Sequence, residues 1–141
     1  MFEFILKNSE KEKILKLCEK VNSSPNNIEI FLNEIKEAAH KLPESLKEVL
    51  NEFKQSGYAA LLLENLYIDS DIETPSSNKY HIGETTLLGK VQAIINCYIG
   101  EMVSYEAEGD GRLFQDMVPN KNQQHSQTSL SSKTELELHT E

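Results

Sequence analysis

The stretch Thr134-Glu135-Leu136-Glu137-Leu138-His139-Thr140-Glu141 closes the sequence and alternates between apolar and polar residues up to His139. This period of two predicts a β-strand with its leucines on one face and its acidic residues on the other. Side chains at positions i and i+2 share a strand face, so His139 and Glu141 can both face one metal ion. Two protein ligands seldom make a competent site, and no residue follows Glu141. The stretch therefore predicts a metal-binding pair whose site these residues do not complete.

Composition limits the class of protein. The sequence has 141 residues and 38% hydrophobic content, which suits one domain. Its 23 acidic and 14 basic residues give a net charge of -9, which disfavours nucleic-acid binding because Lys and Arg must neutralise phosphates. The start lacks the features of a secretory signal, and no apolar run reaches the roughly 20 residues of a membrane helix. We therefore expect a cytoplasmic protein with no membrane partner, in an oligomeric state that the sequence leaves open.

Three amphipathic helices are expected between residues 9 and 56. The first opens on the S-x-x-E capping box that begins at Ser9. The second opens on Ser24-Pro25, and the third runs from Pro43 to just before Gly57. The apolar positions at helical spacing are Ile14, Leu15, Leu17, Cys18 and Val21 in the first, Ile28, Phe31, Ile35, Ala38 and Leu42 in the second, and Leu46, Val49, Leu50 and Phe53 in the third.

Beyond residue 56, the spacing of apolar residues no longer has the helical period throughout. The apolar run 58–63 predicts a strand covered on both faces. A further helix is expected from Thr85 or Thr86 to about Gly100. Residues 102–105 and 112–118 are then predicted strands around a glycine-containing turn, either as a hairpin or as nonadjacent strands.

The remaining metal-ligand residue types have simpler interpretations. Cys18 and Cys97 lie among apolar helix positions and are predicted to be buried, reduced thiols. His40 is expected to be solvated at a helix end, and His81 to lie in a surface loop. His125 falls within residues 119–133, an Asn-, Gln- and Ser-rich stretch predicted to be an exposed loop.

Several motifs together carry a resemblance to a known family. An H-x-E pair alone also fits a solvated acidic strand face. However, four motifs follow one another along this chain in a particular order. They are Gly57-Tyr58 before an apolar strand, the sequence G-R-L-F-Q-D-M-V-P at 111–119, the polar loop and the T-E-L-E-L-H-T-E ending. Over roughly residues 43–141, this order resembles the clavaminate synthase-like iron oxygenases, which include hydroxylases of free arginine and asparagine.

The resemblance implies an Fe(II)- and 2-oxoglutarate-dependent oxygenase. It implies an α+β fold in which N-terminal helices precede the early part of a double-stranded β-helix, or jelly roll, that is incomplete here. Residues 1–56 would be the helical segment and residues 57–141 the first part of the core, together one incomplete domain.

The resemblance also assigns site residues. His139 and Glu141 would be two ligands of a 2-His-1-carboxylate triad, whose open face binds 2-oxoglutarate and O₂. Glu141, Ser129 and Glu108 would contact a free amino-acid substrate similar to arginine or asparagine.

The third histidine, the arginine that pairs with 2-oxoglutarate and the later strands are expected beyond Glu141. Arg112 is the only arginine and belongs to an early strand motif, so it is a poor substitute for that arginine. We therefore expect no turnover from these 141 residues, whether they are a natural truncation, a disrupted reading frame or a fragment. The alternatives are a noncatalytic remnant, a helical interaction module using residues 9–56, or a two-ligand site completed between subunits.

Overall fold

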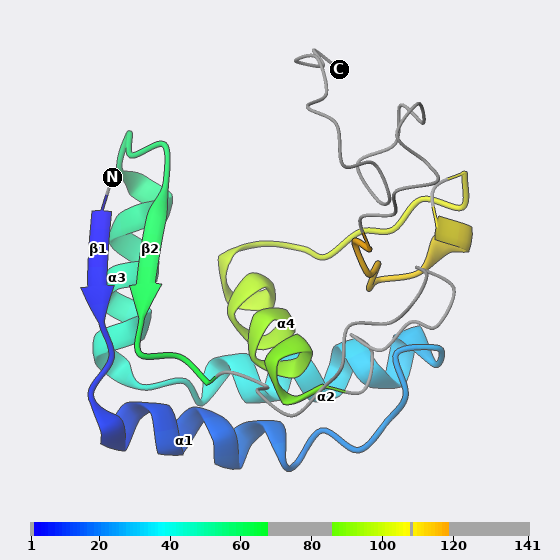
Figure 1. Ribbon diagram of the computed structural model, residues 1–141, viewed down its shortest axis with the longest axis horizontal. Helices are drawn as coiled ribbons and strands as arrows, with labels where there is room; N and C mark the ends of the chain where they lie inside the picture. The colour runs from blue at the N-terminus through cyan, green and yellow to red at the C-terminus, as the bar shows by residue number, and fades with distance from the viewer. Residues whose placement is uncertain (1, 68–85, 108, 119–141) are drawn as a thin grey trace.

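The computed structural model describes residues 2–67, 86–107 and 109–118 (Figure 1). Within these residues lie four α-helices and one two-stranded sheet. The elements in chain order are β1 (Phe2–Ile5), α1 (Asn8–Cys18), α2 (Ile28–His40), α3 (Glu44–Gln55), β2 (Leu61–Glu64), α4 (Leu87–Ile99) and the 3₁₀ turn η2 (Gly109–Gly111). None of the helices in this part of the chain is long and apolar enough to cross a membrane.

Helix α4 lies at the centre of the fold, and it confirms the helix predicted from Thr85 or Thr86 to about Gly100. The Thr86 hydroxyl accepts a hydrogen bond from the Gly89 N–H at 2.9 Å, which caps the first turn, and the helix ends at Ile99 with Gly100 as its C-cap. It packs against α1, α2 and α3 (Figure 1). One hydrophobic core therefore joins α4 to the helices that precede it in sequence.

The predicted apolar stripes of the first three helices supply most of this core, as the 3.6-residue period requires. Ile28 is an exception, since it is 39% exposed at the first residue of α2. The largest fully buried side chains are Leu6, Ile14, Val21, Phe31, Ile35, Leu42, Leu46, Leu50, Val91 and Ile94.

Two helix starts differ from the sequence prediction. At α1 the cap residue is Lys7 rather than Ser9, because the Glu10 carboxylate accepts a hydrogen bond from the Lys7 N–H at 2.7 Å. The second oxygen of Glu10 accepts a hydrogen bond from the Ser45 hydroxyl, which ties α1 to the start of α3. Ser24 and Pro25 begin a turn, closed by a 2.9 Å hydrogen bond from the Asn27 N–H to the Ser24 carbonyl, and α2 starts after it.

Strands β1 and β2 lie side by side and parallel, with Phe2 opposite Leu61 and Ile5 opposite Glu64 (Figure 1). The sequence prediction missed β1. The strand is Leu61–Glu64, and the described residues cover one of its faces rather than the two predicted for residues 58–63: β2 alternates between half-buried and exposed residues, and Leu62 is 41% exposed. The side chains of Leu61 and its inward-facing neighbours pack against the core, so this sheet has one covered face among the described residues.

Neither of the segments predicted as strands, residues 102–105 and 112–118, forms a strand in the described part of the chain. An extended segment becomes a strand only by pairing with a neighbour. The turn between them is as predicted: the Gly111 N–H donates to the Tyr105 carbonyl at 3.1 Å. Asp110 and Gly111 adopt φ values of 57° and 70°, the left-handed region that Gly and Asp tolerate best.

A carboxylate on α2 holds the connection between α1 and α2. One oxygen of Glu34 accepts hydrogen bonds from the Asn22 N–H (2.9 Å), the Ser23 N–H (3.0 Å) and the Ser23 hydroxyl (2.7 Å). The Lys90 ammonium on α4 donates to the neighbouring Val21 carbonyl at 2.8 Å. The bonds from the Ser23 backbone and hydroxyl are the main reason why the pKa of Glu34 is lowered.

Replacing Glu34 by alanine is expected to lower the free energy of unfolding by about 1.5 kcal/mol at neutral pH, because a charged acceptor of several hydrogen bonds is lost. A lowered pKa in the folded state adds stability above the unfolded pKa, and that stability is lost as pH falls through the folded pKa. The difference between the two proteins should therefore shrink below about pH 4.5. Urea unfolding at several pH values measures it.

The matched control is Glu37→Ala on the same helix. The Glu37 carboxylate lies 3.9 Å from the Lys41 ammonium, and their side chains are 80% and 61% exposed. Such a pair contributes little, so this variant should change the unfolding free energy by less than about 0.5 kcal/mol. Equal losses in the two variants would contradict the role given to Glu34.

Candidate functional site

The residues predicted to form the site are His139, Glu141, Ser129 and Glu108, and all four lie outside the described residues, as do His81 and His125. Among the residues that the structure describes, no three His, Cys, Asp or Glu side chains are placed to hold a metal ion. What the structure defines is the framework up to residue 118, from which the chain continues toward the predicted ligands.

The segment with the sequence G-R-L-F-Q-D-M-V is held on this framework by aromatic and apolar contacts. The Phe114 ring meets the Phe31 ring of α2 edge to face, with centroids 5.8 Å apart and planes at 73°. Leu113 packs against the same core, and Val118 is 5% exposed. Edge-to-face pairs are favoured by the ring quadrupoles. Leu113 and Phe114 therefore anchor this segment to the helices.

A second anchor follows β2. Asn65 has a φ of 61°, and its side-chain amide donates to the Leu6 carbonyl at 2.8 Å and to the Asn8 side-chain oxygen at 3.0 Å. Asparagine tolerates this left-handed conformation better than most residues, because its short side chain bonds locally. The end of β2 is thereby tied to the junction of β1 and α1.

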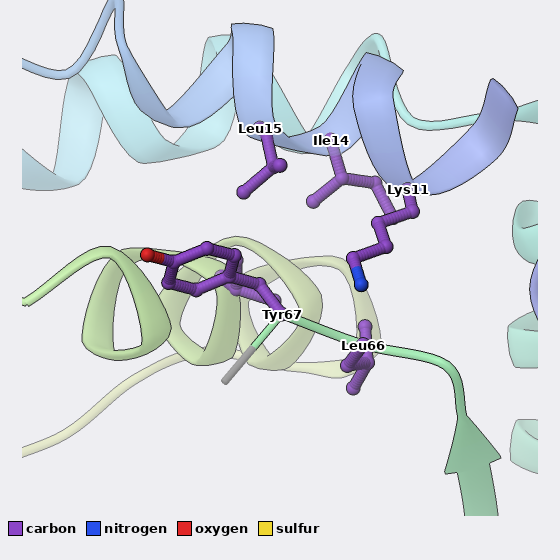
Figure 2. Close-up of a pocket in the computed structure, with 6 residues that line it drawn as sticks. Lys11, Ile14, Leu15, Leu66 and Tyr67 are labelled. Carbon is purple, nitrogen blue, oxygen red and sulfur yellow. The ribbon is translucent and has the colours of Figure 1, made fainter. Parts of the chain in front are cut away.

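A shallow hollow lies between α1, α4 and the residues after β2 (Figure 2). Figure 2 shows the Lys11 ammonium and the Tyr67 hydroxyl among otherwise apolar side chains. Among the described residues that line the hollow there is no histidine or carboxylate, so they do not supply the donors of an iron site. The lining residues are Lys11, Ile14, Leu15, Leu66, Tyr67 and Val91.

The cysteines and His40 behave largely as the sequence predicts. Both cysteines are free; Cys18 is fully buried and Cys97 is half-buried. Burial raises the pKa of the Cys18 thiol to about 11, so it stays protonated and is a poor nucleophile or metal ligand at neutral pH. His40 is exposed at the last residue of α2. These groups therefore supply no alternative site.

Two curated proteins are similar to this chain in sequence. L-lysine 3-hydroxylase of Catenulispora acidiphila is 46% identical over 107 residues, which cover 74% of this chain and 30% of that protein. Clavaminate synthase 2 of Streptomyces clavuligerus is 30% identical over 139 residues, covering 93% of this chain and 42% of that protein. No protein-family model matches the chain.

Solved structures of iron oxygenases are similar to this chain in fold. An asparagine oxygenase in complex with Fe(II), 3-hydroxyasparagine and succinate superposes with a TM-score of 0.76 at 23% identity, covering 93% of this chain and 43% of that one. The non-heme iron oxygenase OrfP in complex with Fe gives a TM-score of 0.81 at 19% identity, covering 95% and 44%. The chain thus shares the fold of part of these oxygenases and spans less than half the length of each of these relatives.

Proposed function

Because this chain belongs to the clavaminate synthase-like Fe(II)/2-oxoglutarate-dependent oxygenases, we propose that it supplies the N-terminal part of an enzyme that hydroxylates a free amino acid. The observation that carries the proposal is the 46% identity to an L-lysine 3-hydroxylase. The lysine hydroxylase is named for carbon 3, and the solved structures of asparagine oxygenase and OrfP contain 3-hydroxyasparagine and (3S)-hydroxy-L-arginine. Carbon 3 of lysine is therefore the first position to test.

His139 and Glu141 would hold Fe(II), since an imidazole and a carboxylate from one strand face are the donor types of the facial triad. Bound Fe(II), together with 2-oxoglutarate and O₂, supplies the oxidant for a C–H bond. The carboxylate of Glu141 would also attract the substrate ammonium, with Ser129 and Glu108 as further substrate contacts. These side chains thus hold the metal and orient the amino acid toward it.

The third histidine and the arginine that binds 2-oxoglutarate would come from polypeptide that corresponds to the rest of the relatives' length. His40 is at the end of α2, and Arg112 belongs to the segment anchored on the helices, so we assign neither of these roles to them. Later strands from that polypeptide would complete the jelly roll. The 141 residues alone would accordingly have no turnover.

The described residues favour this proposal over a helical interaction module. A module using the apolar faces of residues 9–56 would need those faces to be available. Instead, side chains such as Ile14, Phe31 and Leu50 are at most 2% exposed, in a core that also includes α4. The main apolar stripes of these helices are already used in folding.

The test is a hybrid protein in which residues 1–141 are joined to the part of the Catenulispora acidiphila hydroxylase that follows the matched region. With Fe(II), 2-oxoglutarate and O₂, the hybrid should release succinate and a hydroxylated product when lysine, arginine or asparagine is added singly. Product mass and succinate yield are the measurements.

Two controls separate the parts of the proposal. The 141-residue chain alone and the appended part alone should each give less than about 1% of the hybrid's rate, since each lacks metal ligands. Unimpaired turnover by the chain alone would contradict its assignment as one part of an enzyme. A folded, iron-binding hybrid that hydroxylates no amino acid would contradict the assigned reaction.

A further inference from the structure

The outward side of the β1–β2 sheet is an exposed surface of mixed character. We call it the outer face and define it by Glu3, Ile5, Leu62 and Glu64. Ile5 is 66% exposed and Leu62 is 41% exposed, and the two glutamates are exposed beside them. In the strand register Glu3 lies opposite Leu62, and Ile5 lies opposite Glu64. Each strand thus contributes one apolar side chain and one carboxylate.

A parallel pair of strands rarely stands with a face in water. Parallel sheets occur almost only where both faces are covered, and an isolated two-stranded sheet is marginally stable. Here the inward side chains of Phe4, Leu61 and Leu63 pack against the core, whereas the outer face has no cover among the described residues. The described part of the chain therefore covers one face of this sheet and leaves the other exposed.

We propose that the outer face is an interface covered by the strand-rich remainder of the oxygenase. The inference rests on the proposed function. The chain matches OrfP over 95% of its own length but 44% of that structure, so more than half of the OrfP structure is unmatched and is large enough to cover a surface that is open here. The covering surface should present apolar side chains opposite Ile5 and Leu62, with Lys or Arg near Glu3 and Glu64, because buried carboxylates need partners.

Other exposed apolar residues make weaker candidates for this interface. Ile30 and Leu88 are exposed on helices whose buried sides are in the core. Their exposure is ordinary for surface residues. The outer face differs because it joins apolar residues on two hydrogen-bonded strands.

The experiment mixes the 141-residue chain with a separately expressed remainder of the Catenulispora acidiphila hydroxylase and measures their dissociation constant by calorimetry. The variant Ile5→Lys/Leu62→Lys should weaken association at least about tenfold, because two ammonium groups would have to be buried. Ile30→Lys is the control, since Ile30 is 50% exposed on α2, and it should leave the dissociation constant unchanged. Circular dichroism should show all three chains equally folded.

The covalent hybrid provides a second measurement. In the hybrid, the Ile5→Lys/Leu62→Lys substitutions should lower the melting temperature by about 5 °C. In the 141-residue chain, the same substitutions should leave the melting temperature unchanged. Wild-type association in trans with no effect of the double variant on either measurement would overturn the proposal. The proposal would also be overturned if the wild-type chain failed to associate and the double variant left the melting temperature of the hybrid unchanged. Dimers of the 141-residue chain that the double variant dissociates would overturn it too, since the outer face would then bind a second copy.

The inference and the proposed function can fail separately. Association that is lost in the double variant, in a complex that hydroxylates no amino acid, would support the interface and contradict the function. Full hydroxylation by a double-variant hybrid of unchanged stability would support the function and overturn the interface.

Discussion

Replacing Phe31 by alanine is expected to lower the free energy of unfolding by about 3 to 5 kcal/mol. Phe31 is fully buried on α2 and belongs to the core shared with α4. Truncation would remove the buried ring, leave a cavity and end the edge-to-face contact with Phe114. Since small domains have about 5 to 15 kcal/mol of stability in total, the Phe31→Ala protein should lose a large fraction of its stability. Urea unfolding followed by circular dichroism measures the loss.

The neighbouring residue gives a matched control. Ile30 is 50% exposed, so Ile30→Ala on the same helix should cost less than about 0.5 kcal/mol. Phe114→Leu keeps apolar volume but loses the ring pair, and it should cost about 0.5 to 1.5 kcal/mol. A loss below about 1 kcal/mol for Phe31→Ala would contradict the place given to α2 in the core.

Replacing His139 by alanine in the active hybrid is expected to lower turnover at least about 100-fold. Changing outer-sphere partners of metal ligands already costs about 10- to 100-fold in metal affinity or activity, and loss of a direct ligand should cost more. The rate of succinate release at saturating amino acid and 2-oxoglutarate measures this effect.

His40 and His125 provide the comparison. His40 is exposed, and neither histidine has a role in the proposed site, so His40→Ala and His125→Ala should each retain turnover within about twofold. If His139→Ala kept wild-type turnover, or if all three variants lost it equally, the assignment of His139 as a ligand would be wrong.

What the sequence could predict depends on how local the signal is. The period of apolar residues located α4 and the buried positions of α1, α2 and α3, because an amphipathic helix is encoded within its own residues. Helix starts were less certain, since Ser9 and Glu10 both offer capping side chains and only the structure shows that Glu10 reaches Lys7. Boundary differences of this size leave the core intact.

Strands were harder to predict because their pairing is not local. Phe2–Ile5 has only four residues and pairs with Leu61–Glu64, far along the chain. Conversely, residues 102–105 and 112–118 have a strand-like pattern but no paired neighbour in the described part of the chain. Whether a segment joins a sheet depends on its partner, which its own sequence does not specify.

The family was predictable because the motifs occur in one order, and similarity to the lysine hydroxylase and clavaminate synthase confirms it. The site stays a prediction: His139, Glu141, Ser129 and Glu108 lie outside the described residues. The exposed side of β1–β2 was not predictable, because β1 itself was missed and exposure depends on tertiary contacts.

We propose that His139 and Glu141 would hold the Fe(II) that acts together with 2-oxoglutarate. Anaerobic titration of the hybrid with Fe(II) and 2-oxoglutarate, followed by visible absorption, tests it most directly. We expect a metal-to-ligand charge-transfer band that saturates at one iron per chain and is absent in the His139→Ala/Glu141→Ala double variant. A band of full strength in that folded double variant would contradict the claim.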